Sequence, residues 1–225
     1  MEALANHYKT QFSDKHFITS LILSFLLLGV SLAVNSYAAL YVNDISSNAV
    51  SDIVLSNTPV FDVDILFVYG PIIFWAIIAI ACVQDPKKIP FMIKSIAVFV
   101  LIRSLFISLT HLGPYPDRVI VDSMKIGLVS LFSRSGNSFL FSSGGDLFFS
   151  AHTGLPFLMA LVFWRDTYTR IFCLCSAIFF AIIVLLGHLH YSIDVMAAFF
   201  ITYSIFHISE KLFIADRRRF LGTKI

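Results

Sequence analysis

The sequence has little charge. Only 13% of its 225 residues are Asp, Glu, Lys or Arg, whereas soluble domains carry about 25%. Hydrophobic residues make up 58%, and the mean hydropathy is +0.85. These values exclude an ordinary soluble domain and predict a protein embedded in a bilayer. No linker, repeat or low-complexity stretch divides the chain, so we predict a single membrane domain over residues 1–225.

Cysteine is also scarce. Cys82, Cys173 and Cys175 all lie within or at the ends of apolar runs. Two cysteines that are two positions apart on a helix point to different faces, so this spacing suggests neither a disulfide framework nor a metal site. We therefore expect no metal and no cofactor.

Six apolar stretches are long enough to cross about 30 Å of hydrocarbon at roughly 1.5 Å per residue. The alternative for the first is a secretory signal, but its apolar core is longer than the usual h-region of about 7 to 15 residues. The last two stretches are barely long enough to span. We predict an all-α bundle of six transmembrane helices, over Phe17–Tyr37, Ile65–Val83, Phe91–Leu112, Leu147–Trp164, Ile171–Leu186 and Ile193–Ile208.

Positive charge is distributed unevenly among the connections. The first connection, Val42 to Asp64, has no Lys or Arg and four aspartates, and the third, Gly113 to Asp146, has only three basic residues. The positive-inside rule therefore predicts that both termini are cytoplasmic. We interpret the basic C-terminal tail as a signal that sets the topology rather than as a binding site for anionic lipid or nucleic acid. Twelve basic residues lie on the predicted inner side: Lys9, Lys15, Lys87, Lys88, Lys94, Arg165, Arg170, Lys211, Arg217, Arg218, Arg219 and Lys224.

Histidines stand where two apolar segments meet polar loops. His190 and Asp194 are spaced i, i+4, so on one helix the carboxylate can accept a proton from one imidazole nitrogen and leave the other free to attack. His152 lies at the start of the fourth span, which the topology brings to the same, extracytoplasmic end. His188 is two residues from His190 and would lie on another face. Ionisable residues at such depth indicate a functional site.

This set of residues suits phosphoryl transfer. A histidine can attack a phosphoester to form a phosphohistidine, while a second histidine, His152, serves as general acid. Each residue also has a structural explanation: a histidine bonded to backbone, or an aspartate in the first turn of a helix. A zinc site of two histidines and a carboxylate is chemically possible, but no third histidine stands at a compelling ligand spacing.

Two segments resemble a known family. GGDLFFSAHTG (Gly144–Gly154) and HYSIDVMAAFFIT (His190–Thr202) resemble signatures of the sphingomyelin synthases, a branch of the type 2 phosphatidic acid phosphatase superfamily. Arg103, Thr110 and Pro114 resemble, more loosely, that family's third-span segment. The resemblance implies six spans and a His-His-Asp triad that faces the lumen or exterior. Its catalytic segments would be 144–154 and 187–202.

The resemblance implies roles for individual residues. His190 would be the nucleophile, Asp194 its orienting carboxylate and His152 the acid that protonates the departing oxygen. Asp146 matches the family's Gly-Asp position, and its alternative role is a helix cap.

The superfamily's two cationic motifs are absent. The Ser-Arg positions of the second motif hold Ile183 and Val184. Phosphate charge still needs a cation, and Arg103 and Arg134 are the candidates. Arg103 lies deep in its span, which leaves phosphate contact and a structural pair equally open, while Arg134 fits a solvated loop.

The leading hypothesis is a phosphotransferase that moves a phosphorylated headgroup from a glycerophospholipid to ceramide or another lipid alcohol. With water as acceptor, it becomes a phospholipase C-like hydrolase. A lipid phosphate phosphatase needs the same triad, and a transporter with a His and Asp proton relay is the non-enzyme alternative. Segment 119–132 could lie on the membrane surface as a lid. Membrane lipids are the expected partners, nothing indicates nucleic acid, and a homo-oligomer would leave no sequence signature.

Overall fold

The computed structural model describes residues 8, 11–45, 48–118 and 147–222. In these ranges the chain forms helices and no strands, which agrees with the all-α prediction. The helices are α2 (Lys15–Ile45), α3 (Asp64–Gln84), α4 (Ile89–Thr110), α6 (Ala151–Val162), α7 (Thr167–Leu186), α8 (Ser192–Leu212) and α9 (Ile214–Leu221), with short 3-10 turns η1 (Leu55–Asn57) and η2 (Pro86–Lys88).

Five helices are long and apolar enough to cross a bilayer: α2, α3, α4, α7 and α8. Their outward faces are rich in large apolar side chains, such as Phe25 and Leu26 on α2 and Ile73 on α3. Apolar side chains on the outside of a bundle are stable against lipid tails. The chain is therefore an integral membrane protein.

The fourth predicted span is the exception. Instead of one helix over Leu147–Trp164, the chain is non-helical until Ser150 and then forms α6, which has only 12 residues. A helix of that length reaches about 18 Å, short of the roughly 30 Å of hydrocarbon. The helix begins at Ser150 because this side chain caps it by accepting from the Thr153 N–H. The residues that lead into α6, including Leu147, Phe149 and Ser150, are buried, so its N-terminus lies inside the bundle.

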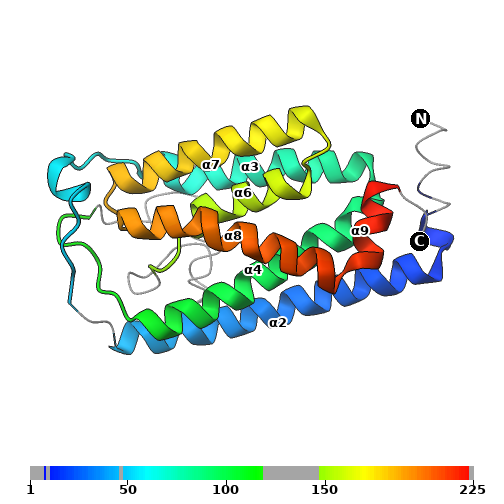
Figure 1. Cartoon of the computed structure of the whole chain (residues 1–225), viewed down its shortest axis with the longest axis horizontal. Helices are drawn as coiled ribbons and strands as arrows, with labels where there is room; N and C mark the ends of the chain where they lie inside the picture. The colour runs from blue at the N-terminus through cyan, green and yellow to red at the C-terminus, as the bar shows by residue number, and fades with distance from the viewer. Residues whose placement is uncertain (1–7, 9–10, 46–47, 119–146, 223–225) are drawn as a thin grey trace.

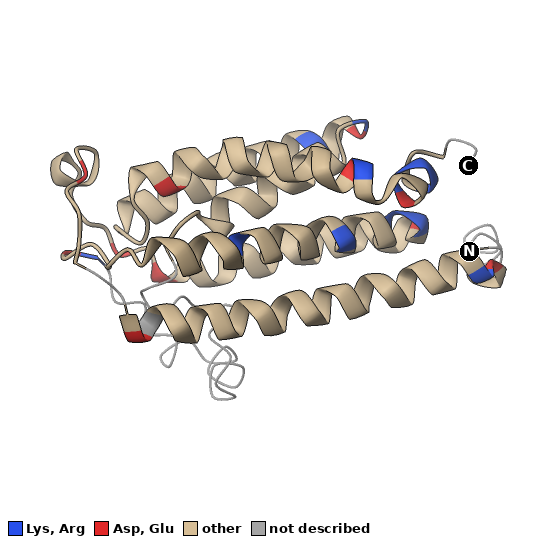
Figure 2. Cartoon of the chain, turned by 60° about the horizontal axis from the view of Figure 1, so that its bottom comes forward, with Lys and Arg blue, Asp and Glu red and all other residues tan. Residues whose placement is uncertain are grey.

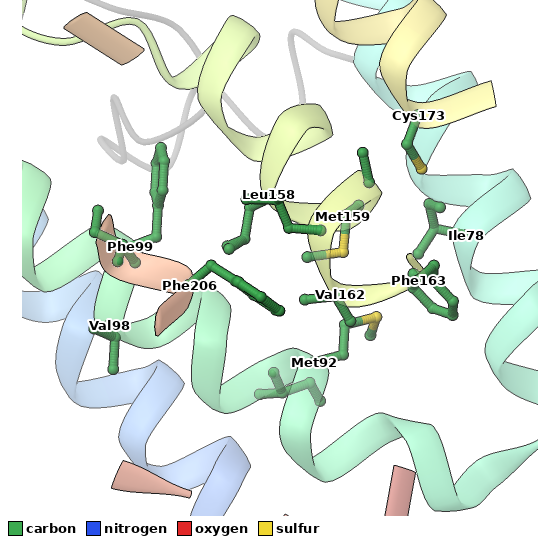
Figure 3. Packing of buried hydrophobic residues seen from close by; sticks show 14 of the residues in the cluster. Ile78, Met92, Val98, Phe99, Leu158, Met159, Val162, Phe163, Cys173 and Phe206 are labelled. Atoms are coloured by element: carbon green, nitrogen blue, oxygen red, sulfur yellow. The ribbon is translucent and has the colours of Figure 1, made fainter. Parts of the chain in front are cut away.

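The core forms around α6. This helix packs against α7 and α8 and also contacts α4, while α2 packs along α4 (Figure 1). Figure 3 shows Leu158, Met159 and Val162 of α6 among Phe99 of α4 and Phe206 of α8. All five are buried. The core therefore holds α6 in place between the spanning helices.

Glycine allows the closest approach of α6 to its neighbours. A Cβ atom at Gly154 would lie 2.7 Å from Phe99 Cε2 and 2.9 Å from Thr202 Oγ1. Both distances are shorter than van der Waals contact, so any other residue would push α6 away from α4 and α8.

The start of α2 and the end of α9 lie at the same end of the bundle (Figure 1). Most of the described Lys and Arg residues gather there too (Figure 2). Among those predicted for one side, Lys9 and Lys224 lie outside the described residues, and Lys94 is buried on α4. The charge asymmetry expected from the sequence is therefore a property of the fold.

A buried ion pair fastens α9 to this basic end. Lys94 Nζ lies 2.6 Å from Asp216 Oδ2 and donates to Ser20 Oγ at 2.8 Å. Ser20 in turn donates to Asp216. All three side chains are buried, so the cluster joins α2, α4 and α9.

Candidate active site

His190 and Asp194 lie at the start of α8. The first turn of this helix is formed by a capping box in which Asp194 Oδ2 accepts from the Tyr191 N–H at 3.0 Å. The same oxygen lies 3.5 Å from His190 Nδ1. The two atoms are in contact but not hydrogen-bonded, since Nδ1 has no hydrogen-bond partner among the described residues. Catalytic contacts of this kind often tighten only when substrate is bound.

The pair is shielded from solvent. Asp194 is 0% exposed and His190 is 4% exposed. A buried carboxylate needs compensation, which Asp194 receives from the Tyr191 N–H, the N-terminal end of the α8 dipole and the adjacent imidazole. In such surroundings, charge on the carboxylate acts strongly on the imidazole.

The N-terminus of α6 meets the N-terminus of α8. The Ser150 N–H donates to the backbone oxygen of Asp194 at 3.2 Å. Because Ser150 is the N-cap of α6, His152 stands in the first turn of that helix. The fold therefore brings the two histidine-containing segments together.

The His152 ring is held between two helices. It stacks on Phe67 of α3 with ring centroids 4.1 Å apart, and it lies edge-on to Phe180 of α7 at 6.2 Å. These contacts fix the plane of the imidazole at the boundary of α3, α6 and α7.

Arg103 lies beside the entry to α6. Its guanidinium is buried and donates from Nε to the backbone oxygen of Phe149 at 2.9 Å. Phe149 directly precedes the N-cap Ser150. The sequence left phosphate contact and a structural pair equally open for Arg103, and the structure places its side chain beside the start of α6.

Two of the predicted site residues, Asp146 and Arg134, lie outside the described residues, as does the predicted lid 119–132. His188 is described: it is 3% exposed, and its Nε2 lies 3.1 Å from the Thr58 backbone oxygen. Its backbone is left-handed, with φ of 52°. His188 therefore belongs to the turn that leads into His190. The sequence had indicated only that His188 would lie on another face.

Sequence reasoning missed the part that residues 48–63, here called the first loop, have in the site. This loop contacts the segment Leu186–Ser192 at several points. The Phe61 N–H donates to Leu186 O at 2.9 Å, and the Val50 N–H donates to the Tyr191 hydroxyl at 3.2 Å. No local signal in the sequence indicates these contacts, because they join residues more than 120 positions apart.

The strongest contact of the first loop comes from Asp52. Its Oδ2 accepts from the Ser192 N–H at 2.6 Å. Burial alone would raise the pKa of the Asp52 carboxyl, but backbone and side-chain hydrogen bonds from Ser192 and backbone hydrogen bonds from Leu55 and Val54 outweigh it and hold the pKa below its ordinary value. Asp52 is therefore a carboxylate at neutral pH.

Among the described residues, no group of three or more His, Cys, Asp or Glu side chains is placed to hold a metal ion. The zinc alternative raised by the sequence thus gains no ligand set from this part of the chain. The chemistry that the described site offers directly is that of two histidines, a carboxylate and a buried arginine.

Residues 143–211 match the family model described as PAP2 superfamily C-terminal. This match supports the PAP2 superfamily. The matched part is less than a third of the chain and contains α6, α7 and nearly all of α8, with His152, His190 and Asp194. Arg103 and the first loop lie outside it.

PAP2 superfamily proteins are typically lipid phosphatases or phosphotransferases, so the match supports an enzyme at that level. No curated protein and no solved structure matches the chain.

Proposed function

We propose that this protein is a lipid phosphotransferase that moves a phosphorylated headgroup from a glycerophospholipid to a lipid alcohol such as ceramide or diacylglycerol. The observation that carries the proposal is the buried pair of His190 and Asp194 at 3.5 Å, set against the N-terminus of the helix that bears His152. The finer assignment to the sphingomyelin synthase-like branch is part of this proposal and rests on the sequence segments around these residues.

In the first step, His190 is the nucleophile. Its Nδ1 faces Asp194, so Nε2 is the nitrogen that forms the bond to phosphorus. The bond from phosphorus to the diacylglycerol oxygen breaks, and its electron pair stays on that oxygen, which takes a proton from His152. Asp194 stabilises the positive charge that develops on the His190 imidazole.

In the second step, the acceptor hydroxyl attacks the phosphohistidine. His152, now neutral, takes the hydroxyl proton, the phosphorus–nitrogen bond breaks, and His190 is regenerated. Two features of the fold can stabilise the phosphate charge: Arg103, beside the entry to α6, and the positive end of the α6 dipole. They would act in place of the superfamily's missing cationic motifs.

A lipid acceptor is preferred over water because the segments that contain His152 and His190 resemble those of the sphingomyelin synthases. A lipid phosphate phosphatase and a phospholipase C-like hydrolase both need water at this position, so they are the second choice.

The charge distribution supports a location for the site. His190 and Asp194 lie at the start of α8, and α8 begins at the end of the bundle opposite α9 and the start of α2 (Figure 1). By the positive-inside rule, the basic end and both termini would be cytoplasmic and the site extracytoplasmic.

The test uses purified protein in mixed liposomes that contain headgroup-labelled phosphatidylcholine or phosphatidylethanolamine, fluorescent ceramide and phosphatidic acid. Wild type is compared with His190→Ala and with His207→Ala, a matched control because His207 is an exposed histidine farther along the same helix that pairs with Glu210. The proposal predicts labelled ceramide product in wild type and His207→Ala, and none in His190→Ala.

Other outcomes would replace the proposal. Phosphate released only from phosphatidic acid would make the protein a phosphatase, and a freed phosphorylated headgroup would make it a hydrolase. A lipid product that persists in His190→Ala would remove His190 from the mechanism. If no lipid product depends on His190, a transporter becomes the better reading, and ion or lipid flux is then the quantity to measure.

A further inference from the structure

Asp52 holds two parts of the structure with one carboxylate. Its Oδ1 accepts from the N–H groups of Val54 and Leu55 at 2.8 and 3.2 Å, which fixes the turn of the first loop. Its Oδ2 accepts from the Ser192 N–H at 2.6 Å. The side chain is 7% exposed. A charged group this well buried, with both oxygens bonded, forms a rigid link between the first loop and α8.

Ser192 is the first residue of α8, and its N–H is one of the groups that a helix leaves without an internal partner. Asp194 satisfies the N–H of Tyr191, and Asp52 satisfies the next one. Two carboxylates, one from α8 and one from the first loop, therefore accept from successive N–H groups at the start of α8. Asp194 also faces His190, so the orientation of this turn sets the position of the pair.

The first loop holds the chain on both sides of His190. Before it, His188 Nε2 lies 3.1 Å from Thr58 O. After it, the Tyr191 hydroxyl accepts from the Val50 N–H at 3.2 Å and donates to Gly113 O at 2.8 Å. Together with the contact of Asp52 to Ser192, these hydrogen bonds fix residues on both sides of His190.

We infer that Asp52 is a positioning residue: its carboxylate orients the first turn of α8 so that His190 and Asp194 keep the geometry needed for attack on phosphorus. The inference rests on the function proposed above. A misplacement of about 1 Å in a reacting group can cost up to roughly 100-fold in rate. Loss of the link should therefore lower kcat strongly, while KM and the thermal stability of the protein change little.

Two variants of Asp52 separate its roles. In Asp52→Asn the amide keeps one acceptor oxygen, so it can hold the loop turn or the Ser192 N–H but not both. Asp52→Glu keeps two carboxylate oxygens on a longer side chain. Asp62→Asn is the matched control: Asp62 is an exposed aspartate of the same loop whose Oδ1 accepts from Asp64 N–H at the start of α3.

The experiment measures three quantities on full-length protein in liposomes: kcat and KM for headgroup transfer, thermal stability, and amide hydrogen exchange over residues 191–195. For Asp52→Asn we expect faster exchange in this segment, a 10-fold to 100-fold lower kcat, little change in KM, and a folded protein. Asp52→Glu should recover part of the kcat, and Asp62→Asn should behave as wild type.

Each contrary result overturns a defined claim. Wild-type kcat in Asp52→Asn, or unchanged exchange over residues 191–195, overturns the positioning role. A loss of kcat that only follows the loss of folded protein reduces Asp52 to a structural cap. If wild type itself forms no lipid product, the proposed function fails first. The positioning role would then also be wrong, and faster exchange in Asp52→Asn would show only that Asp52 caps the start of α8.

Discussion

Gly154 offers a direct test of how the packing of α6 supports the site. In Gly154→Ala the new Cβ would meet Phe99 Cε2 at 2.7 Å, whereas ordinary contact begins at 3.4 Å. The new Cβ and the Phe99 ring must therefore move apart by about 0.7 Å. Phe99 is 0% exposed and lies edge-on to Phe149 at 5.3 Å, so its ring has little room to move, and α6 itself must shift.

The expected energy is the difference of two effects. Overpacking of a filled core costs about 1 to 3 kcal/mol, while replacing glycine by alanine within a helix gains about 1 kcal/mol. The net destabilisation is thus roughly 0 to 2 kcal/mol. Activity should fall further than stability, because His152 stands two residues before Gly154 on the helix that shifts, and a displacement near 1 Å can cost up to about 100-fold in rate.

The assay compares kcat for headgroup transfer and the thermal midpoint in detergent for wild type, Gly154→Ala and Gly29→Ala. Gly29 is the control because a Cβ there meets nothing within 4 Å. We expect Gly29→Ala to keep full activity and stability. If Gly154→Ala also kept wild-type kcat and midpoint, the reasoning that links α6 packing to the site would be refuted.

Three further predictions follow from the site and its supports. Asp194→Asn should fold, because its amide oxygen can still accept from the Tyr191 N–H, but should lose roughly 100-fold or more in kcat; wild-type turnover would contradict the role of the carboxylate. Because the pKa of Asp52 lies below its ordinary value of 3.8, its stabilising effect is complete above that pH and is lost as the pH falls through the folded-state pKa. The gap in thermal midpoint between wild type and Asp52→Asn should therefore be present at pH 7 and shrink below about pH 3.8, and a gap independent of pH would count against it. Lys94→Met should lower stability by up to about 3 kcal/mol, because it leaves the buried Asp216 with only Arg219 at 3.7 Å and the Ser20 hydroxyl, and Lys94→Met/Asp216→Leu should recover most of the loss; a wild-type midpoint for Lys94→Met would show that the pair contributes nothing.

Five of the six apolar stretches form long apolar helices, as expected for runs of about 20 apolar residues. The fourth stretch differs for a local reason. Apolar residues continue through Leu147 and Phe149, so hydropathy predicted a helix there, but Ser150 caps the helix from within the bundle. Hydropathy carries no information about a cap inside an apolar run.

The His190–Asp194 pair was visible in the sequence because the i, i+4 spacing is a local property of a helix. Arg103 was also a candidate from the sequence, with phosphate contact and a structural pair equally open, and the fold places its side chain at Phe149, beside the start of α6. The contact of Asp52 was not visible, because Asp52 was one of four aspartates in an acidic loop. Its contact to Ser192 joins residues 140 positions apart, so it is a product of the fold and not of any local pattern.

The central claim is that His190 forms a covalent intermediate with the phosphorylated headgroup. The most direct measurement is mass spectrometry of the protein after brief reaction with a headgroup-labelled glycerophospholipid, quenched at alkaline pH to preserve phosphohistidine. We predict an acid-labile adduct on the peptide that contains His190, its absence in His190→Ala, and its accumulation when acceptor lipid is withheld. Turnover in wild type with no adduct, or an adduct on another residue that persists in His190→Ala, would contradict the account.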